Sequence, residues 1–288
     1  MSELAVARSD VKDRRRRRRF GSVLIWVCWT IVLIVLACAM FGELIAPQSP
    51  NAQDLALGVT PPSGDHLLGT DELGRDVLSR VIVGARTAVI GPVLIALGGT
   101  FIGVLLGLMA GYAGGWLDTI TLRWADLMFA LPGHLVAIVV VGVLGGGYAL
   151  AIIVLIVLST PYDTRLIRAA TLEQRPRPYV EAARLLGLPG RRIAVQHIWP
   201  NLVPLVMASG FLGFAYGLLA LSALSFLGLG VGPGTADWGR MLAESLVLIF
   251  SNPAGALAPG GLIVLTAASV NLIGDWLEEV LSDRGRAR

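Results

Sequence analysis

Long apolar runs separated by short polar segments form the main pattern along this chain. The runs fall at 23–45, 87–112, 127–144, 148–162, 202–224 and 257–273. A helix crosses roughly 30 Å of hydrocarbon in about 20 residues, so the pattern predicts six transmembrane helices. The third and fourth runs are short and only Gly145–Gly147 separates them, which leaves one helix through that region as an alternative.

The distribution of Arg and Lys decides between these two topologies. Six spans with a cytoplasmic N-terminus place 19 basic residues inside the cell and 4 outside, whereas five spans would place 10 inside and 13 outside. The cytoplasmic loops of membrane proteins carry the excess of Lys and Arg. We therefore expect six spans with both termini in the cytoplasm.

The composition agrees with a membrane protein. Of the 288 residues, 55% are hydrophobic and 15% are charged, against about 25% charged in soluble domains. The basic block Arg14–Arg19 directly precedes the first run, where orientation in the membrane explains it, so we expect contact with lipid and no nucleic-acid partner. Cys28 and Cys38 share one run and would lie about 15 Å apart along a helix, too far for a disulfide.

Motifs for catalysis and metal binding are missing from the sequence. A phosphate-binding loop needs a Gly-Lys-Ser/Thr sequence, and Lys12 is the only lysine, so we expect no ATP site and no enzymatic activity in this chain. His66, His134 and His197 are far apart and lack partners at ligand spacing, so no metal site is predicted. We expect His134, just after Pro132, to line the inner end of a broken helix.

An ion-coupled carrier is also disfavoured by the sequence. Such carriers place carboxylates or broken polar helices near the membrane midplane, and no Asp or Glu is predicted near the centre of a span. Arg123 and Asp126, at a span end, are expected to pair with each other. If the chain neither hydrolyses ATP nor uses an ion gradient, a partner must supply the energy.

The longest predicted internal loop, 163–200, contains a short helical hairpin. Pro178 suits the first turn of a helix, and Gly187 can take the positive φ that ends one. Glu181 and Arg184 are expected on one face of the helix. The opposite face is predicted to contain Tyr179, Ala182, Ala183 and Leu186. The hairpin is either a docking surface for a partner or a solvated connector held at the lipid headgroups by its arginines.

The predicted outer segment has a turn-rich motif with alternating charges. It consists of Gly69, Thr70, Asp71, Gly74, Arg75 and Asp76. The motif forms either a structured loop packed on the membrane helices or a contact with a partner. Arg75 stands among carboxylates, so we expect a local surface ion pair worth about 0–1 kcal/mol.

These segments resemble a known family. One segment resembles the EAA loop of the membrane subunits of binding-protein-dependent ABC importers. It contains Glu181-Ala182-Ala183, then Gly187, and further on Ile198-Trp199-Pro200. Residues 67–86, 123–132, 224–230 and 271–284 are similar to segments of the C-type permeases of dipeptide and oligopeptide importers. The chain departs from the family at Trp199, Pro178 and Leu221, where Leu, an acidic residue and Glu are common.

The resemblance implies an all-α integral membrane protein with six transmembrane helices, in which one N-terminal helix precedes a five-helix type I ABC importer permease core. The implied segments are a cytoplasmic basic tail at 1–20, the first span at 21–46, an extracytoplasmic segment at 47–86, the core at 87–280 with the coupling loop 163–200, and a cytoplasmic tail at 281–288.

The resemblance also implies a function. It indicates a permease subunit in a bacterial inner membrane that forms a pore for dipeptides or oligopeptides with a second permease. Two ABC ATPases would bind ATP and Mg, and an extracytoplasmic peptide-binding protein would deliver the substrate. The implied ATPase-coupling residues are Glu181, Ala182, Ala183, Gly187, Ile198 and Pro200. The alternatives are a stand-alone carrier or channel, and an ABC permease for nickel, glutathione or another small solute.

Overall fold

The computed structural model describes residues 2–286, and side chains at 23–281. In this range the regular structure is helical, with one isolated β-bridge between Thr70 and Asp76 and no strand. The elements are α1 (Ser2–Ile45), α2 (Val77–Ala113), α3 (Gly115–Ala130), α4 (Gly133–Val143), α5 (Tyr148–Gln174), α6 (Pro178–Leu185), α7 (Gly190–Ile193), the π-helical turn η1 (Ala194–Ile198), α8 (Trp199–Phe226), α9 (Trp238–Glu244) and α10 (Ala254–Arg286).

Five helical segments are long and apolar enough to cross a membrane. They are Val23–Ile45, Val77–Ala113, Tyr148–Gln174, Gly190–Phe226 and Ala254–Leu281. The pair α3 and α4, bent by 83° between Ala130 and Gly133, gives six when it is counted as one broken span. The predicted break beside Pro132 is confirmed, but this span begins at Gly115 instead of residue 127. Proline cannot donate the next backbone hydrogen bond, so the helix stops there.

Two helices continue beyond the predicted ends of their spans. The segment predicted to lie outside the cell ends at Asp76 and not at residue 86, because Val77 already begins α2. Helix α5 continues to Gln174, although its span was predicted to end at residue 162. Because α5 ends at Gln174 and the next spanning segment starts at Gly190, the predicted internal loop 163–200 shortens to residues 175–189.

Ion pairs explain why α5 continues through charged residues. Arg168 of α5 donates from Nη2 to Oδ2 of Asp118, in α3, at 2.7 Å. Arg165 of α5 forms an ion pair with Asp126, also in α3. Arg123 also lies 3.8 Å from Asp126, so the predicted pair exists but shares its carboxylate with Arg165. Because α3 supplies counter-charges to these two arginines, the helix continues past them.

A stripe of glycines sets the distance between α2 and α5. Gly99, Gly103, Gly107 and Gly111 recur every four residues along α2. A β-carbon on Gly107 would lie 2.7 Å from the carbonyl oxygen of Thr164 in α5. Small residues at this spacing let membrane helices approach closely, so the stripe brings the two backbones together.

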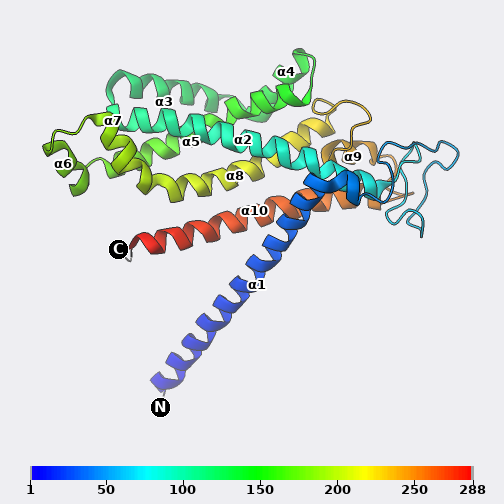
Figure 1. Cartoon of the computed structure of the whole chain (residues 1–288), viewed down its shortest axis with the longest axis horizontal. Coiled ribbons are helices and arrows are strands. Elements are labelled where there is room, and N and C mark those ends of the chain that lie inside the picture. The colour runs from blue at the N-terminus through cyan, green and yellow to red at the C-terminus, as the bar shows by residue number, and fades with distance from the viewer. Residues whose placement is uncertain (1, 287–288) are drawn as a thin grey trace.

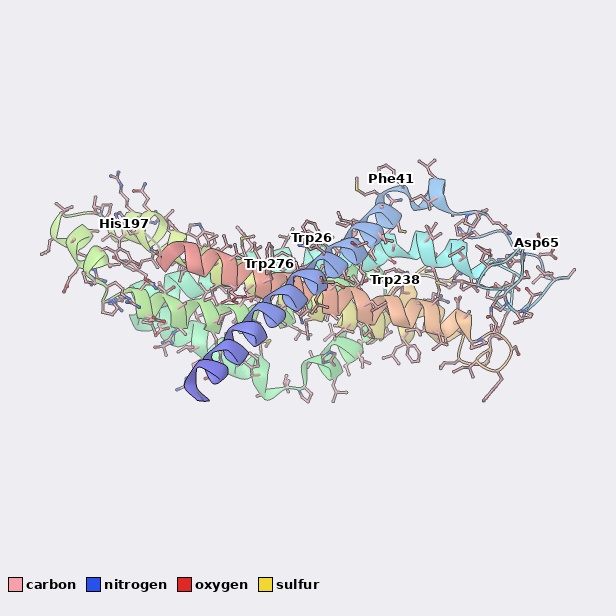
Figure 2. The ribbon with its side chains drawn as sticks, turned by 90° about the horizontal axis from the view of Figure 1, so that it is seen from below. Trp26, Phe41, Asp65, His197, Trp238 and Trp276 are labelled. Atoms are coloured by element: carbon pink, nitrogen blue, oxygen red, sulfur yellow. The ribbon has the colours of Figure 1, made fainter. Side chains whose placement is uncertain are left out.

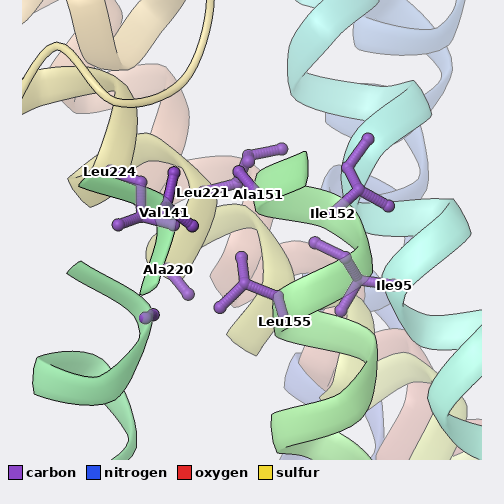
Figure 3. Packing of buried hydrophobic residues seen from close by; sticks show 9 residues of the cluster. Ile95, Val141, Ala151, Ile152, Leu155, Ala220, Leu221 and Leu224 are labelled. Carbon is purple, nitrogen blue, oxygen red and sulfur yellow. The ribbon is translucent and has the colours of Figure 1, made fainter. Parts of the chain in front are cut away.

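The apolar core joins α2, α4, α5 and α8, and Figure 3 shows its packing. Leu221 of α8 is buried in this cluster among Ile95, Leu155 and Leu224. Glu is common at this position in the family that the sequence resembles. In this chain, Leu221 therefore places an apolar side chain inside the bundle.

The two ends of the bundle carry different structures. Helices α6 and α7 lie at one end, and the irregular segment between α1 and α2 lies with α9 at the other (Figure 1). Figure 2 shows the same separation through His197 and Asp65, which stand at opposite ends. Helix α1 packs on α2 and α10 through its later half, where Val35 is buried beside Ala85 and Ile263. Both cysteines are free, as predicted from their spacing.

Candidate functional site

Helix α6 packs on the bundle through Val180 and Ala183. Val180 and Ala183, three residues apart, are buried, whereas Ala182 and Leu186 are exposed. The cluster that receives this face contains Ile167, Ile193, Ile198 and Leu202, from α5, α7, η1 and α8. Of the four residues predicted to share one face, Ala183 is buried, and Val180 is buried with it because side chains of α5 and α8 cover both.

The end of α6 agrees with the sequence prediction. Gly187 has a φ of 74°, and its N–H donates to the Arg184 carbonyl at 2.9 Å. The N–H of Leu188 donates to the Ala183 carbonyl at 3.2 Å. This pair of hydrogen bonds is the Schellman arrangement that ends many helices. A β-carbon at Gly187 would meet nothing within 4 Å, so the positive φ, not crowding, favours glycine there.

The side of α6 that faces away from the bundle presents apolar side chains to solvent. Leu185 is 87% exposed and Leu186 is 80% exposed at the end of the helix, and Glu181 is exposed in its first turn. Arg184 lies over the Tyr112 ring of α2, with its guanidinium carbon 5.7 Å from the ring centroid. Two adjacent exposed leucines on a short, anchored helix suit a protein contact.

The six predicted coupling residues divide between this surface and its support. Glu181 and Ala182 are exposed on α6, and Gly187 forms the turn that ends it. Ala183 and Ile198 are buried beneath the helix. Pro200 is exposed in the first turn of α8, where a missing N–H costs little.

A polar contact that the sequence did not indicate fixes α6 to its neighbours. The Tyr179 hydroxyl donates to Gln174 Oε1 at 2.7 Å, and Asn201 Nδ2 donates to the Tyr179 oxygen at 3.3 Å. Desolvation raises the pKa of the Tyr179 phenol, with Arg177 acting in the opposite direction. These hydrogen bonds connect α6 with the end of α5 and the start of α8.

At the opposite end of the bundle, the outer motif is a folded turn. Thr70 and Asp76 form the β-bridge, and Gly74 has a φ of 70°. Asp76 caps α2 by accepting from the Ser79 N–H at 2.8 Å and from its hydroxyl at 2.7 Å. A side-chain oxygen at this position satisfies a backbone N–H that the helix leaves free. His66 Nδ1 lies 3.0 Å from the second Asp76 oxygen.

The predicted local pair of Arg75 is confirmed, with Asp71, but it lies in a buried ion network and not at the surface. The Nε of Arg75 donates to Asp71 Oδ2 at 2.6 Å, and its Nη2 donates to Glu244 Oε2 of α9 at 3.0 Å. Arg80, 1% exposed, lies 3.6 Å from the same Asp71 oxygen and 3.2 Å from the same Glu244 oxygen. Arg240 also donates to Glu244, at 2.8 Å. The network attaches the outer turn to α2 and α9.

We predict that Arg75→Ala lowers the stability of the purified subunit more than the loss of a surface pair would. Asp71 would lose its shortest charged hydrogen bond and keep only its longer charged contact, with Arg80 at 3.6 Å, and a buried group that loses a hydrogen-bond partner costs about 1–3 kcal/mol. Arg86→Ala is the matched control, because Arg86 is exposed and lies 3.8 Å from exposed Glu43; we expect at most about 1 kcal/mol there. Thermal unfolding in detergent measures both, and equal melting temperatures would contradict the structural role of the network.

The described side chains hold no group of three or more His, Cys, Asp and Glu that could ligate a metal. His134 lies in the first turn of α4, immediately after the helix break, with its ring 5.7 Å from the Tyr216 ring in an edge-to-face arrangement.

The fold and the two ends of the bundle are those of a multi-pass membrane protein with a helical hairpin projecting at one end. Residues 103–286 match the family model for the binding-protein-dependent transport system inner membrane component. The chain belongs to this family, whose members serve transport.

Curated relatives cover most of the chain. It is 38% identical over 263 residues to the di/tripeptide transport system permease protein DppC of Pseudomonas aeruginosa, covering 88% of this chain and 86% of the relative. It is 38% identical over 271 residues to the glutathione transport system permease protein GsiD of Escherichia coli, covering 94% and 89%. The GsiD of Pectobacterium atrosepticum is 36% identical over 254 residues, covering 88% and 84%.

Proposed function

We propose that this chain is a pore-forming permease subunit of an ATP-driven importer for dipeptides or oligopeptides. The observation that carries the proposal is the exposed Leu185–Leu186 surface on an α6 helix anchored to α5 and α8. An isolated channel or carrier has no need for such a surface, whereas a subunit driven by a separate ATPase requires one. The peptide substrate rests on the name of the Pseudomonas aeruginosa relative.

Glutathione is the second candidate substrate. Two of the relatives named above are glutathione permeases, at 36% and 38% identity. Glutathione is itself a small peptide with a free α-ammonium group, so both candidates present similar chemistry to a pore.

The proposed complex contains three kinds of protein partner. A second homologous permease completes the pore, two ABC ATPases bind ATP and Mg at the α6 end, and an extracytoplasmic binding protein delivers substrate at the outer end. The α6 end and both termini then face the cytoplasm of a bacterial cell, which agrees with the excess of arginine in 163–200. This chain contributes no ATP site, as Lys12, its only lysine, lies outside a phosphate-binding motif.

Packing beneath α6 suggests how ATPase movement reaches the pore. Val180 and Ala183 contact a cluster that includes Ile167 of α5 and Leu202 of α8. Close-packed side chains have low compressibility and transmit displacement. A force on α6 would therefore move the inner ends of α5 and α8 together, which is the rigid-body type of switch between two pore states.

Reconstitution tests the proposed function. The chain is purified with its second permease and both ATPases, inserted into proteoliposomes and supplied with the binding protein and labelled dialanine. We expect uptake only with ATP and only when all partners are present. Uptake by this chain alone would identify a stand-alone carrier or channel and would contradict the proposal.

A further inference from the structure

A buried carboxylate lies near the middle of α5, where the sequence was expected to place none. Asp163 is 5% exposed and belongs to the span Tyr148–Gln174. Its neighbours come from the central parts of other spans, namely Gly99, Gly103 and Thr100 of α2 and Ser209 of α8. The prediction that no Asp or Glu lies near the centre of a span was wrong, because α5 continues past residue 162.

Asp163 lacks a charged partner within the part of the chain whose side chains are described. Thr100 donates from Oγ1 to Asp163 Oδ2 at 3.3 Å. Ser209, whose hydroxyl donates to the Val206 carbonyl at 3.1 Å, lines the same cavity as Asp163. The arginines that follow in α5 are directed elsewhere, since Arg165 pairs with Asp126 and Arg168 with Asp118. A carboxylate at membrane depth without a counter-charge is unfavourable and calls for a functional explanation.

The carboxylate lines a cavity of about 350 Å³ between α3, α5 and α8. Its polar lining consists of Ser159, Tyr162, Asp163, Ser209 and Tyr216. Phe129 of α3 and Leu212 of α8 also line the cavity, and both are exposed, as is Tyr162, so the cavity is open at the bundle surface. Its volume lies within the range of about 300–1,000 Å³ that small-ligand sites occupy.

The opening faces either lipid or the surface shared with the second permease. Lipid cannot solvate a carboxylate, and intramembrane acids almost always face the bundle interior or a water-filled path. The polar lining therefore indicates that the cavity faces the path of the substrate.

We infer that Asp163 binds the α-ammonium group of the substrate during its passage through the pore. An ammonium carries three N–H donors, which the carboxylate and neighbouring hydroxyl oxygens can accept, and its charge compensates that of Asp163. A bound metal cation would need more acidic or imidazole ligands, and no group of three exists among the described side chains. This inference rests on the proposed import of peptides and names the group of the substrate that the pore recognises.

The first test is Asp163→Asn in the complete transporter, in proteoliposomes with binding protein and ATP. The amide keeps the size and an oxygen that can accept from Thr100, but it removes the charge. We expect uptake of dialanine, and of glutathione if that is the substrate, to fall at least about tenfold, the factor that corresponds to a modest loss of ion pairing. ATP hydrolysis should still respond to loaded binding protein, because the ATPase contacts are unchanged.

Asp126→Asn is the matched control, since Asp126 is an α3 carboxylate outside the cavity lining and paired with Arg165. We expect it to retain uptake. Wild-type uptake by Asp163→Asn would overturn the inference but leave the proposed function intact. Absence of ATP-dependent uptake in the wild-type complex would instead overturn the proposed function.

A second measurement needs no variant and applies even if Asp163→Asn fails to assemble. The hydrophobic reagent dicyclohexylcarbodiimide modifies membrane-embedded carboxyl groups, and mass spectrometry locates the product. In the wild-type complex we expect modification at Asp163, slowed by dialanine but not by N-acetyl-dialanine, which has no ammonium. Equal slowing by both peptides, or by neither, would overturn the inference.

Discussion

Replacing Gly107 with leucine should prevent the subunit from folding into a stable helical bundle. A β-carbon at this position would lie 2.7 Å from the Thr164 carbonyl oxygen and 2.9 Å from the Ile167 β-carbon. The first of these atoms belongs to the backbone, so relief requires α2 and α5 to separate. Overpacking of this kind costs about 1–3 kcal/mol or more, and here it would also disturb neighbouring contacts of the glycine stripe. We expect the amount of monodisperse subunit recovered in mild detergent to fall to about a tenth of wild type or less.

Gly261→Leu provides the control for this prediction. Gly261 is also a helical glycine, in α10, but it is exposed and a β-carbon there would meet nothing within 4 Å. The variant should be recovered at the wild-type level. If Gly107→Leu were also recovered as a monodisperse subunit with an unchanged melting temperature, the close approach of α2 and α5 would not be needed for the fold.

The double variant Leu185→Ser and Leu186→Ser should uncouple the permease from its ATPases without unfolding it. Both side chains are already exposed, so polar replacements remove little burial from the subunit itself. If both leucines are buried on docking, their loss removes about 1.5–3 kcal/mol each. We therefore expect recovery of the permease at the wild-type level, at least a hundredfold weaker binding of the ATPases, and loss of substrate uptake.

Leu55→Ser is the comparison for the double variant. Leu55 is exposed in the segment between α1 and α2, at the end of the bundle opposite α6. It should not affect the affinity for the ATPases, which light scattering or calorimetry on purified components can measure. Unchanged affinity and transport in the double variant would return α6 to the role of a connector.

The apolar spans and several turns could be predicted because short-range physics determines them. A long apolar run has one stable arrangement in lipid, so Val23–Ile45 was located correctly from composition. The positive φ at Gly187 and the break at Pro132 follow equally from the chemistry of single residues.

Features that depend on distant partners could not be predicted. Arg75 was expected at the surface because its second carboxylate, Glu244, lies 169 residues further along the chain. The end of α5 was misplaced because Asp118 and Asp126 of α3 neutralise its arginines. Because the span was predicted to end at residue 162, Asp163 fell just outside it. The buried face of α6 was missed because α5 and α8 determine which of its side chains are covered.

Photo-crosslinking from α6 tests the central claim, that this helix transmits the action of the ATPase. A photoreactive amino acid is placed at Leu186 in the complete transporter, and at Phe250, which is 97% exposed near the outer end, as the control. We expect irradiation to join position 186 to an ATPase subunit, with a yield that changes between nucleotide-free and ATP-bound complexes, and to give no such product at position 250. An actively transporting complex without an ATPase product at position 186 would show that α6 does not contact the ATPase, and would contradict its role in transmitting ATPase action.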